Sequence, residues 1–118
     1  MNSAAKTVYY FGFYLLLLSV ALTAFPNVLL TLFQMPETNE VWIRVVGVLV
    51  FSIGIYYVFM AQTNNTLFLT ITVFIRTSIL LWFIVFVLIS WAEPMLILFG
   101  VIDVLGALWT YLELKKLE

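Results

Sequence analysis

Three ionisable side chains interrupt the long apolar stretches of this 118-residue chain: Arg44, Arg76 and Asp103. A charged side chain at the centre of a bilayer costs about 2.5–3.5 kcal/mol on insertion scales, so each one needs a partner or a water-filled space. An arginine and a carboxylate can satisfy one another as an ion pair, and either can hold the polar group of a ligand. A lone buried acid can also carry a proton. The chemistry open to this chain therefore centres on these residues.

Arg76 and Asp103 are predicted to lie at the same depth. Each is nine residues from the same end of its apolar run, which is about 14 Å along a helix at 1.5 Å per residue. The two runs are joined by a short polar turn and must be antiparallel neighbours. The sequence therefore predicts an ion pair between Arg76 and Asp103 near the middle of the membrane.

Two threonines share the helix faces of this pair. Thr72 is one turn before Arg76, and Thr110 is two turns after Asp103. The four residues form a candidate binding site for a lipophilic ligand. A purely structural role, in which the pair fixes helix register, is the competing interpretation.

Arg44 lies near the start of another apolar run, about 5 Å from its end. A second, shallower ion pair with Glu93 is predicted, and Glu40 is the competing partner. Arg44 can instead extend its side chain to the headgroups of the lipids, since long cationic side chains reach toward water in this way.

Other kinds of chemistry lack the residues they need. The chain contains no Cys and no His, so it offers no thiolate nucleophile and no imidazole base or metal ligand. Its serines have no base beside them, and Asp103 is the only acid at depth. No cofactor or metal site is expected, and a net charge of -1 leaves no basic face for nucleic acid. These features favour a protein that is not an enzyme.

The composition predicts the elements that position these residues. Hydrophobic residues make up 65% of the chain and charged residues 9%, and the mean hydropathy is +1.18. Soluble domains carry about 25% charged residues. We expect one all-α membrane domain, an up-down bundle of four helices, because a helix of ~20 apolar residues spans a bilayer. The four predicted spans are residues 7–25, 41–60, 67–91 and 95–112.

A shorter apolar segment, residues 27–35, follows the first span. It is too short to cross about 30 Å of hydrocarbon, so we expect an interfacial helical turn. Asn27 is predicted to cap its start.

Four crossings place both termini on one side of the membrane. The side of the termini carries the lysines, which are Lys6, Lys115 and Lys116. The opposite side carries most of the glutamates, which are Glu37, Glu40 and Glu93. The positive-inside rule then predicts a multi-pass protein of the inner membrane with both termini in the cytoplasm.

The last three spans carry a pattern that resembles the DoxX-like group of small bacterial membrane proteins. The pattern consists of Arg44-x-x-Gly47 with Gly54, then Arg76, then Phe99-Gly-x-x-Asp103-x-x-Gly106. The resemblance implies a four-helix bundle in the cytoplasmic membrane. It also implies a role as a partner or accessory subunit, since some members serve quinone-linked oxidoreductases.

Three functional hypotheses follow. The favoured one is a small membrane binding or accessory protein, with a lipophilic molecule or a membrane protein as its partner beside the lipid bilayer. The second is a proton- or ion-coupled exporter that acts as a homodimer. The third is a membrane isomerase or a component of a quinone-linked enzyme.

Overall fold

Continuous apolar runs cross a bilayer as helices because every backbone polar group must find a partner within the segment. The computed structural model, which describes residues 1–117, consists of helices joined by short turns. Four of them are long and apolar enough to span a membrane, which confirms the predicted all-α class with four spans. They are α1 (Ser3–Ala24), α3 (Trp42–Ala61), α4 (Thr66–Leu88) and α5 (Leu96–Lys116).

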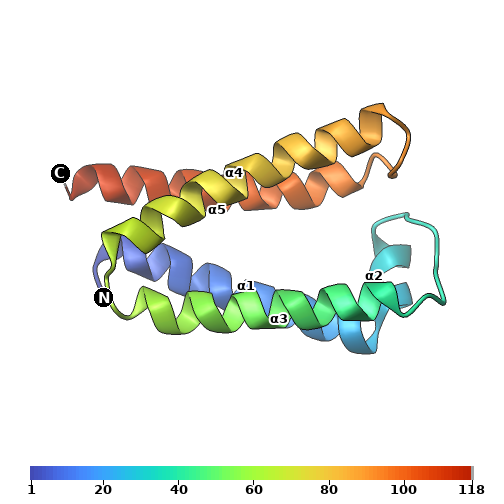
Figure 1. Ribbon diagram of the computed structural model, residues 1–118, viewed down its shortest axis with the longest axis horizontal. Helices are drawn as coiled ribbons and strands as arrows, with labels where there is room; N and C mark the ends of the chain where they lie inside the picture. Colours follow the sequence, from blue (N-terminus) through green and yellow to red (C-terminus); the bar gives the residue numbers. More distant parts are fainter. Residues whose placement is uncertain (118) are drawn as a thin grey trace.

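The long helices are arranged as two antiparallel pairs (Figure 1). Helix α1 packs along α3, and α4 packs along α5, as expected for neighbours joined by a short turn. The pairs meet at the end that holds both termini, where α1 contacts α5, and they diverge toward the other end. Helices α3 and α4 follow one another in the chain but make few contacts.

The short segment after the first span forms α2 (Pro26–Leu32). Its proline stands in the first turn, where the missing N–H costs no hydrogen bond. The prediction that Asn27 caps this helix is wrong. The Asn27 side chain instead accepts a hydrogen bond of 2.9 Å from the backbone N–H of Thr38 and so ties α2 to the loop that leads into α3.

The third span is shorter than the predicted range of 67–91. Helix α4 ends at Leu88 because Ser90 takes a left-handed conformation with φ of 63°. The Trp91 N–H then bonds back to the Phe86 carbonyl oxygen at 2.8 Å, a closure that satisfies the last carbonyls of a helix. The helix of the fourth span, α5, in contrast continues four residues beyond the predicted end at 112.

Glycines allow α1 and α3 to approach closely. A Cβ atom on Gly54 would lie 2.9 Å from the Leu16 side chain and 3.2 Å from the Gly12 carbonyl oxygen. A Cβ atom on Gly12 would lie 2.9 Å from Val58 in α3. Small residues at such contacts are typical of helix pairs in membranes, where packing rather than hydrophobic burial drives association.

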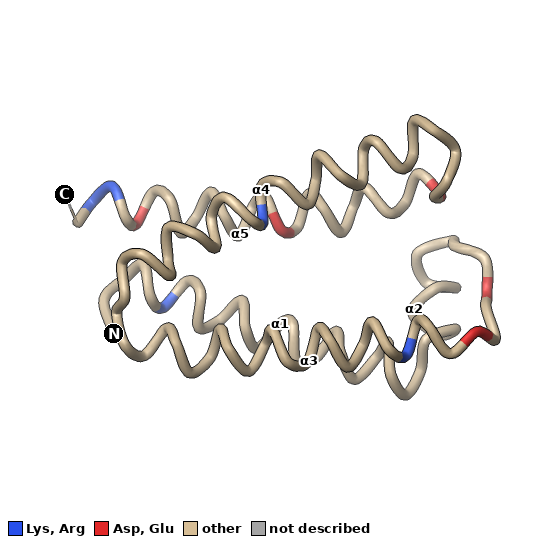
Figure 2. The backbone as a smooth tube through the Cα atoms, viewed as in Figure 1, with Lys and Arg blue, Asp and Glu red and all other residues tan. Residues whose placement is uncertain are grey.

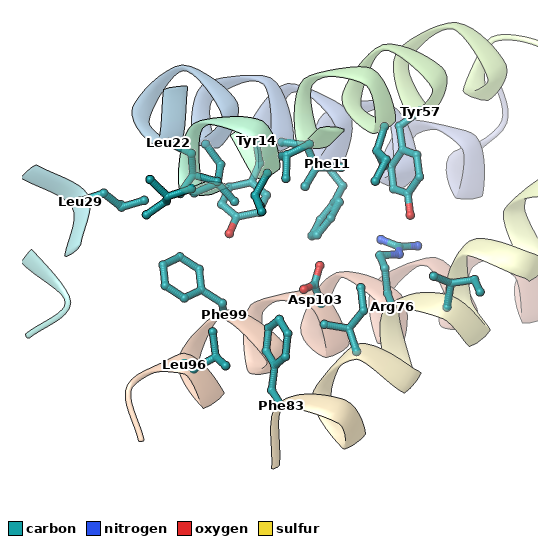
Figure 3. A pocket seen from close by; sticks show the side chains of 18 of the residues that line it. Phe11, Tyr14, Leu22, Leu29, Tyr57, Arg76, Phe83, Leu96, Phe99 and Asp103 are labelled. Atoms are coloured by element: carbon teal, nitrogen blue, oxygen red, sulfur yellow. The ribbon is translucent and has the colours of Figure 1, made fainter. Parts of the chain in front are cut away.

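The charged residues are separated along the long axis of the bundle (Figure 2). The lysines lie at the end with both termini, and Glu37, Glu40 and Glu93 lie at the opposite end with α2. Arg76 on α4 and Asp103 on α5 line the same cavity (Figure 3), as expected of residues that lie at a similar level of two antiparallel helices.

The close approach at Gly54 generates a stability prediction. Gly54→Val should lower the free energy of unfolding by about 1–3 kcal/mol, because the added atoms overlap Leu16 and the α1 backbone. Unfolding of the purified protein in micelles by sodium dodecyl sulfate measures this change. The control is Val48→Leu on the exposed face of the same helix. Equal stability of the two variants would contradict the packing described here.

Candidate functional site

Arg76 is the largest side chain that the fold buries completely, with 1% of its surface exposed. Its Nε donates to the Thr72 carbonyl oxygen at 3.1 Å. Its Nη2 donates to the hydroxyl oxygens of Thr72 at 3.1 Å and of Thr110 at 2.9 Å. The guanidinium is therefore held by its own helix and by α5, because a buried charge needs hydrogen-bond partners.

The first helix joins this cluster through Thr7, which is also buried. The hydroxyl oxygens of Thr7 and Thr110 lie 2.5 Å apart, and the Thr7 hydroxyl donates to the Ala4 carbonyl oxygen at 2.7 Å. The Thr110 hydroxyl accepts from Arg76 and likewise lies 3.1 Å from a backbone acceptor, the Gly106 carbonyl oxygen, so either threonine can be the donor in the contact between them. A chain of hydrogen bonds thus links α4, α5 and α1.

Two aromatic rings complete the surroundings of the guanidinium. The Arg76 Cζ atom lies 4.9 Å from the centre of the Phe11 ring and 5.8 Å from that of Tyr57, which are cation–π distances. Phe11 comes from α1 and Tyr57 from α3, so all four long helices contribute to this one group. Gly106 provides the space, because a Cβ there would lie 2.7 Å from Phe11 and 3.1 Å from Arg76 Nη1.

One nitrogen of the guanidinium is left without a partner. Arg76 Nη1 is buried and makes no hydrogen bond with any residue that the structure describes. A buried donor without an acceptor costs about 1–3 kcal/mol, and more when it is charged. Such an atom in an otherwise satisfied cluster marks a place where an acceptor is missing.

A cavity of about 520 Å³ lies beside this cluster, between the two helix pairs (Figure 3). Its wall is almost entirely aliphatic and aromatic. Its polar side chains are Tyr14, Tyr57, Arg76 and Asp103. Leu29 and other residues of α2 and its following loop line the end where the pairs diverge. The cavity is therefore an apolar space with polar groups gathered on one part of its wall.

Arg76 and Asp103 face this same cavity but do not form the predicted ion pair. Among residues 1–117, the ion pair within 4.0 Å joins Lys116 to Glu113. The reason is the tilt of side chains toward the N-terminus of their own helix. In antiparallel helices this tilt points Arg76 toward Thr72 and Asp103 the opposite way. The prediction of a direct contact is corrected to a shared cavity.

The two predicted threonines serve the arginine and do not line the cavity. Sequence reasoning missed Thr7, Phe11 and Tyr14, which lie on one face of α1 at helical spacing. That spacing indicates an inward-facing stripe on the first span, but the span has no charged residue that would single this stripe out as part of a site. Tyr57 is one of two adjacent tyrosines, and the sequence alone does not show which of the two faces inward.

The second predicted ion pair does not form either. Arg44 is exposed and donates to the Thr23 carbonyl oxygen at the end of α1. Within the described residues it lies within ion-pair distance of neither Glu93 nor Glu40. Glu93 stands on the turn between α4 and α5, and the divergence of the helix pairs separates that turn from the start of α3 (Figure 2).

Comparison with protein-family models, curated proteins and solved structures gave no match. The resemblance to the DoxX-like group therefore stays a hypothesis. In the part of the chain that the structure describes, no cluster of three acidic residues gathers as a metal ion would require. The geometry of the cavity and of the Arg76 cluster is the basis for a function.

The Arg76 cluster predicts the effect of removing one hydroxyl. Thr110→Val keeps the side-chain shape but removes one of the two acceptors of Nη2 and the partner of Thr7. We expect a loss of about 1–3 kcal/mol in the free energy of unfolding. The control is Thr77→Val, because Thr77 is exposed and bonds only to its own helix. If both variants unfold alike, the cluster does not hold the helices together.

Proposed function

We propose that this protein is a membrane binding protein that takes a lipophilic small molecule into the cavity between its helix pairs. The observation that carries the proposal is the cavity itself, with its apolar wall and its few polar groups. Binding sites for small molecules typically measure about 300–1,000 Å³ and combine an apolar lining with a small number of polar groups. The role is one of binding, without catalysis.

Access from the bilayer supports the proposal. Helices α3 and α4 make few contacts, and the cavity lies where the pairs diverge. A molecule dissolved in the hydrocarbon can therefore enter sideways between these helices without crossing water. Its apolar body would contact side chains such as Leu18 and Phe83, and its polar group would lie near Arg76 and Asp103.

We place the protein in the inner membrane with both termini in the cytoplasm. The lysines at the terminal end and the glutamates at the other end support this orientation through the positive-inside rule. A role as accessory subunit of a membrane enzyme rests on the resemblance to the DoxX-like group. In that role the bound lipophile would be shared with the partner.

A second candidate function is export coupled to protons, which would require a homodimer of this small bundle. The position of Asp103 favours it. A carboxylate that lines a cavity and forms no ion pair within 4.0 Å with a described residue is able to exchange a proton or bind a cation. One measurement distinguishes export from binding. If the protein is an exporter, vesicles that contain it take up tetraphenylphosphonium when a pH gradient is applied, and Asp103→Asn abolishes this uptake.

The binding proposal predicts that filling the cavity expels its occupant. Ile79 lines the cavity on α4, so Ile79→Phe should reduce the amount of lipophilic compound that co-purifies with the protein by several fold. Mass spectrometry of organic extracts from the gently purified full chain measures the ratio of compound to protein. Leu81→Phe, on the exposed face of the same helix, is the control and should change nothing.

The proposal fails if both phenylalanine variants retain the same compounds in the same amounts, since the bound molecules then belong to the outer surface. It also fails if the unmodified protein carries no compound at a fixed ratio. Driven uptake of tetraphenylphosphonium in that case would move the exporter to first place.

A further inference from the structure

We propose that the cavity selects molecules whose polar group is an uncharged hydroxyl, held between Arg76 and Asp103. This inference rests on the proposed binding function and names the chemical class of the ligand. Long-chain alcohols, isoprenoid alcohols and sterols share that group. The argument depends on what each polar atom in the wall lacks.

Arg76 supplies a donor that has no acceptor. Three contacts with Thr72 and Thr110 satisfy Nε and Nη2, whereas Nη1 is buried and has no partner among the described residues. Those contacts also fix the guanidinium in place, so Nη1 cannot turn away to find an acceptor. A ligand oxygen is the missing partner.

The ring of Phe11 controls access to this donor. Phe11 lines the cavity, and its ring lies 4.9 Å from the guanidinium carbon. An incoming oxygen therefore reaches Nη1 when this ring shifts. The movement needs no change in the helices, because the cavity provides space on the open side of the ring.

Asp103 supplies the complementary acceptor. Its carboxylate points into the cavity beside the guanidinium, and none of the hydrogen bonds among residues 1–117 reaches it (Figure 3). The Tyr14 hydroxyl points into the same space from α1. An ionised carboxylate only accepts hydrogen bonds, so it needs a donor from the ligand.

A hydroxyl meets both needs at once, because it donates one hydrogen bond and accepts others. A ligand carboxylate would satisfy Arg76 but be repelled by Asp103. A ligand ammonium would pair with Asp103 but be repelled by Arg76. A ketone could accept from Nη1 but would leave Asp103 without a donor. The opposite charges of the wall thus favour a neutral group over either ion.

Five probes of equal chain length test this selection: tetradecanol, methyl dodecyl ketone, tetradecanoate, tetradecylammonium and tetradecane. Each competes with radiolabelled tetradecanol for the purified full chain in micelles at mildly alkaline pH. We expect tetradecanol to bind at least about tenfold more tightly than every other probe, because each hydrogen bond to a charged group is worth about 1.5–3 kcal/mol.

Asp103→Asn tests the role of the carboxylate without removing the acceptor, since the amide oxygen remains. In this variant tetradecanoate should gain severalfold in affinity, whereas tetradecanol should lose severalfold because its acceptor is no longer charged. Glu113→Gln is the matched control, because Glu113 lies on the same helix outside the cavity and pairs with Lys116. It should leave the order of the probes unchanged.

The order of affinities separates the ways in which the inference can fail. Tightest binding by tetradecanoate would assign an anion site at Arg76, and tightest binding by tetradecylammonium a cation site at Asp103; either result overturns the hydroxyl. Equal binding of all five probes, tetradecane included, overturns it while the binding function stands. Failure of every probe to bind overturns the binding function as well.

Discussion

The burial of one guanidinium in the middle of the bundle is the constraint on which the rest of this structure depends. A cation removed from water is tolerated only when hydrogen bonds and favourable charges replace its hydration. Arg76 obtains them from threonines on α4 and α5 and from the rings of Phe11 and Tyr57. No helix pair could provide this surrounding alone, so the requirement brings the two pairs together at this level.

The same requirement explains why the helices separate elsewhere. Within each pair, glycines such as Gly54 allow contact along the whole length. Between the pairs, the polar contacts gather toward the end with both termini, where Thr7 meets Thr110. Beyond that level a cavity remains between the pairs. It is bounded at its far end by α2 and the following loop, where the rings of Phe33 and Phe99 lie 4.5 Å apart. The cavity is thus a consequence of local attachment between two well-packed units.

Length and hydropathy were sufficient to predict the four spans, since a bilayer requires about 20 apolar residues per crossing. Counting residues from the ends of the runs also placed Arg76 and Asp103 at one depth. It could not give the direction of their side chains, which tilt oppositely in antiparallel helices. Nor could it reveal that α1 pairs with α3 or that Thr7 completes the cluster, because uncharged residues on an apolar helix carry little signal.

The two helix pairs meet most closely at the end with both termini and diverge toward the other end. The angle between the two helix pairs sets the width of the cavity. A small rotation of one pair about the end with both termini changes this width, while the hydrogen bonds inside each pair are kept. The width of the cavity therefore depends on how far the two helix pairs open, and this opening is separate from the packing within either pair.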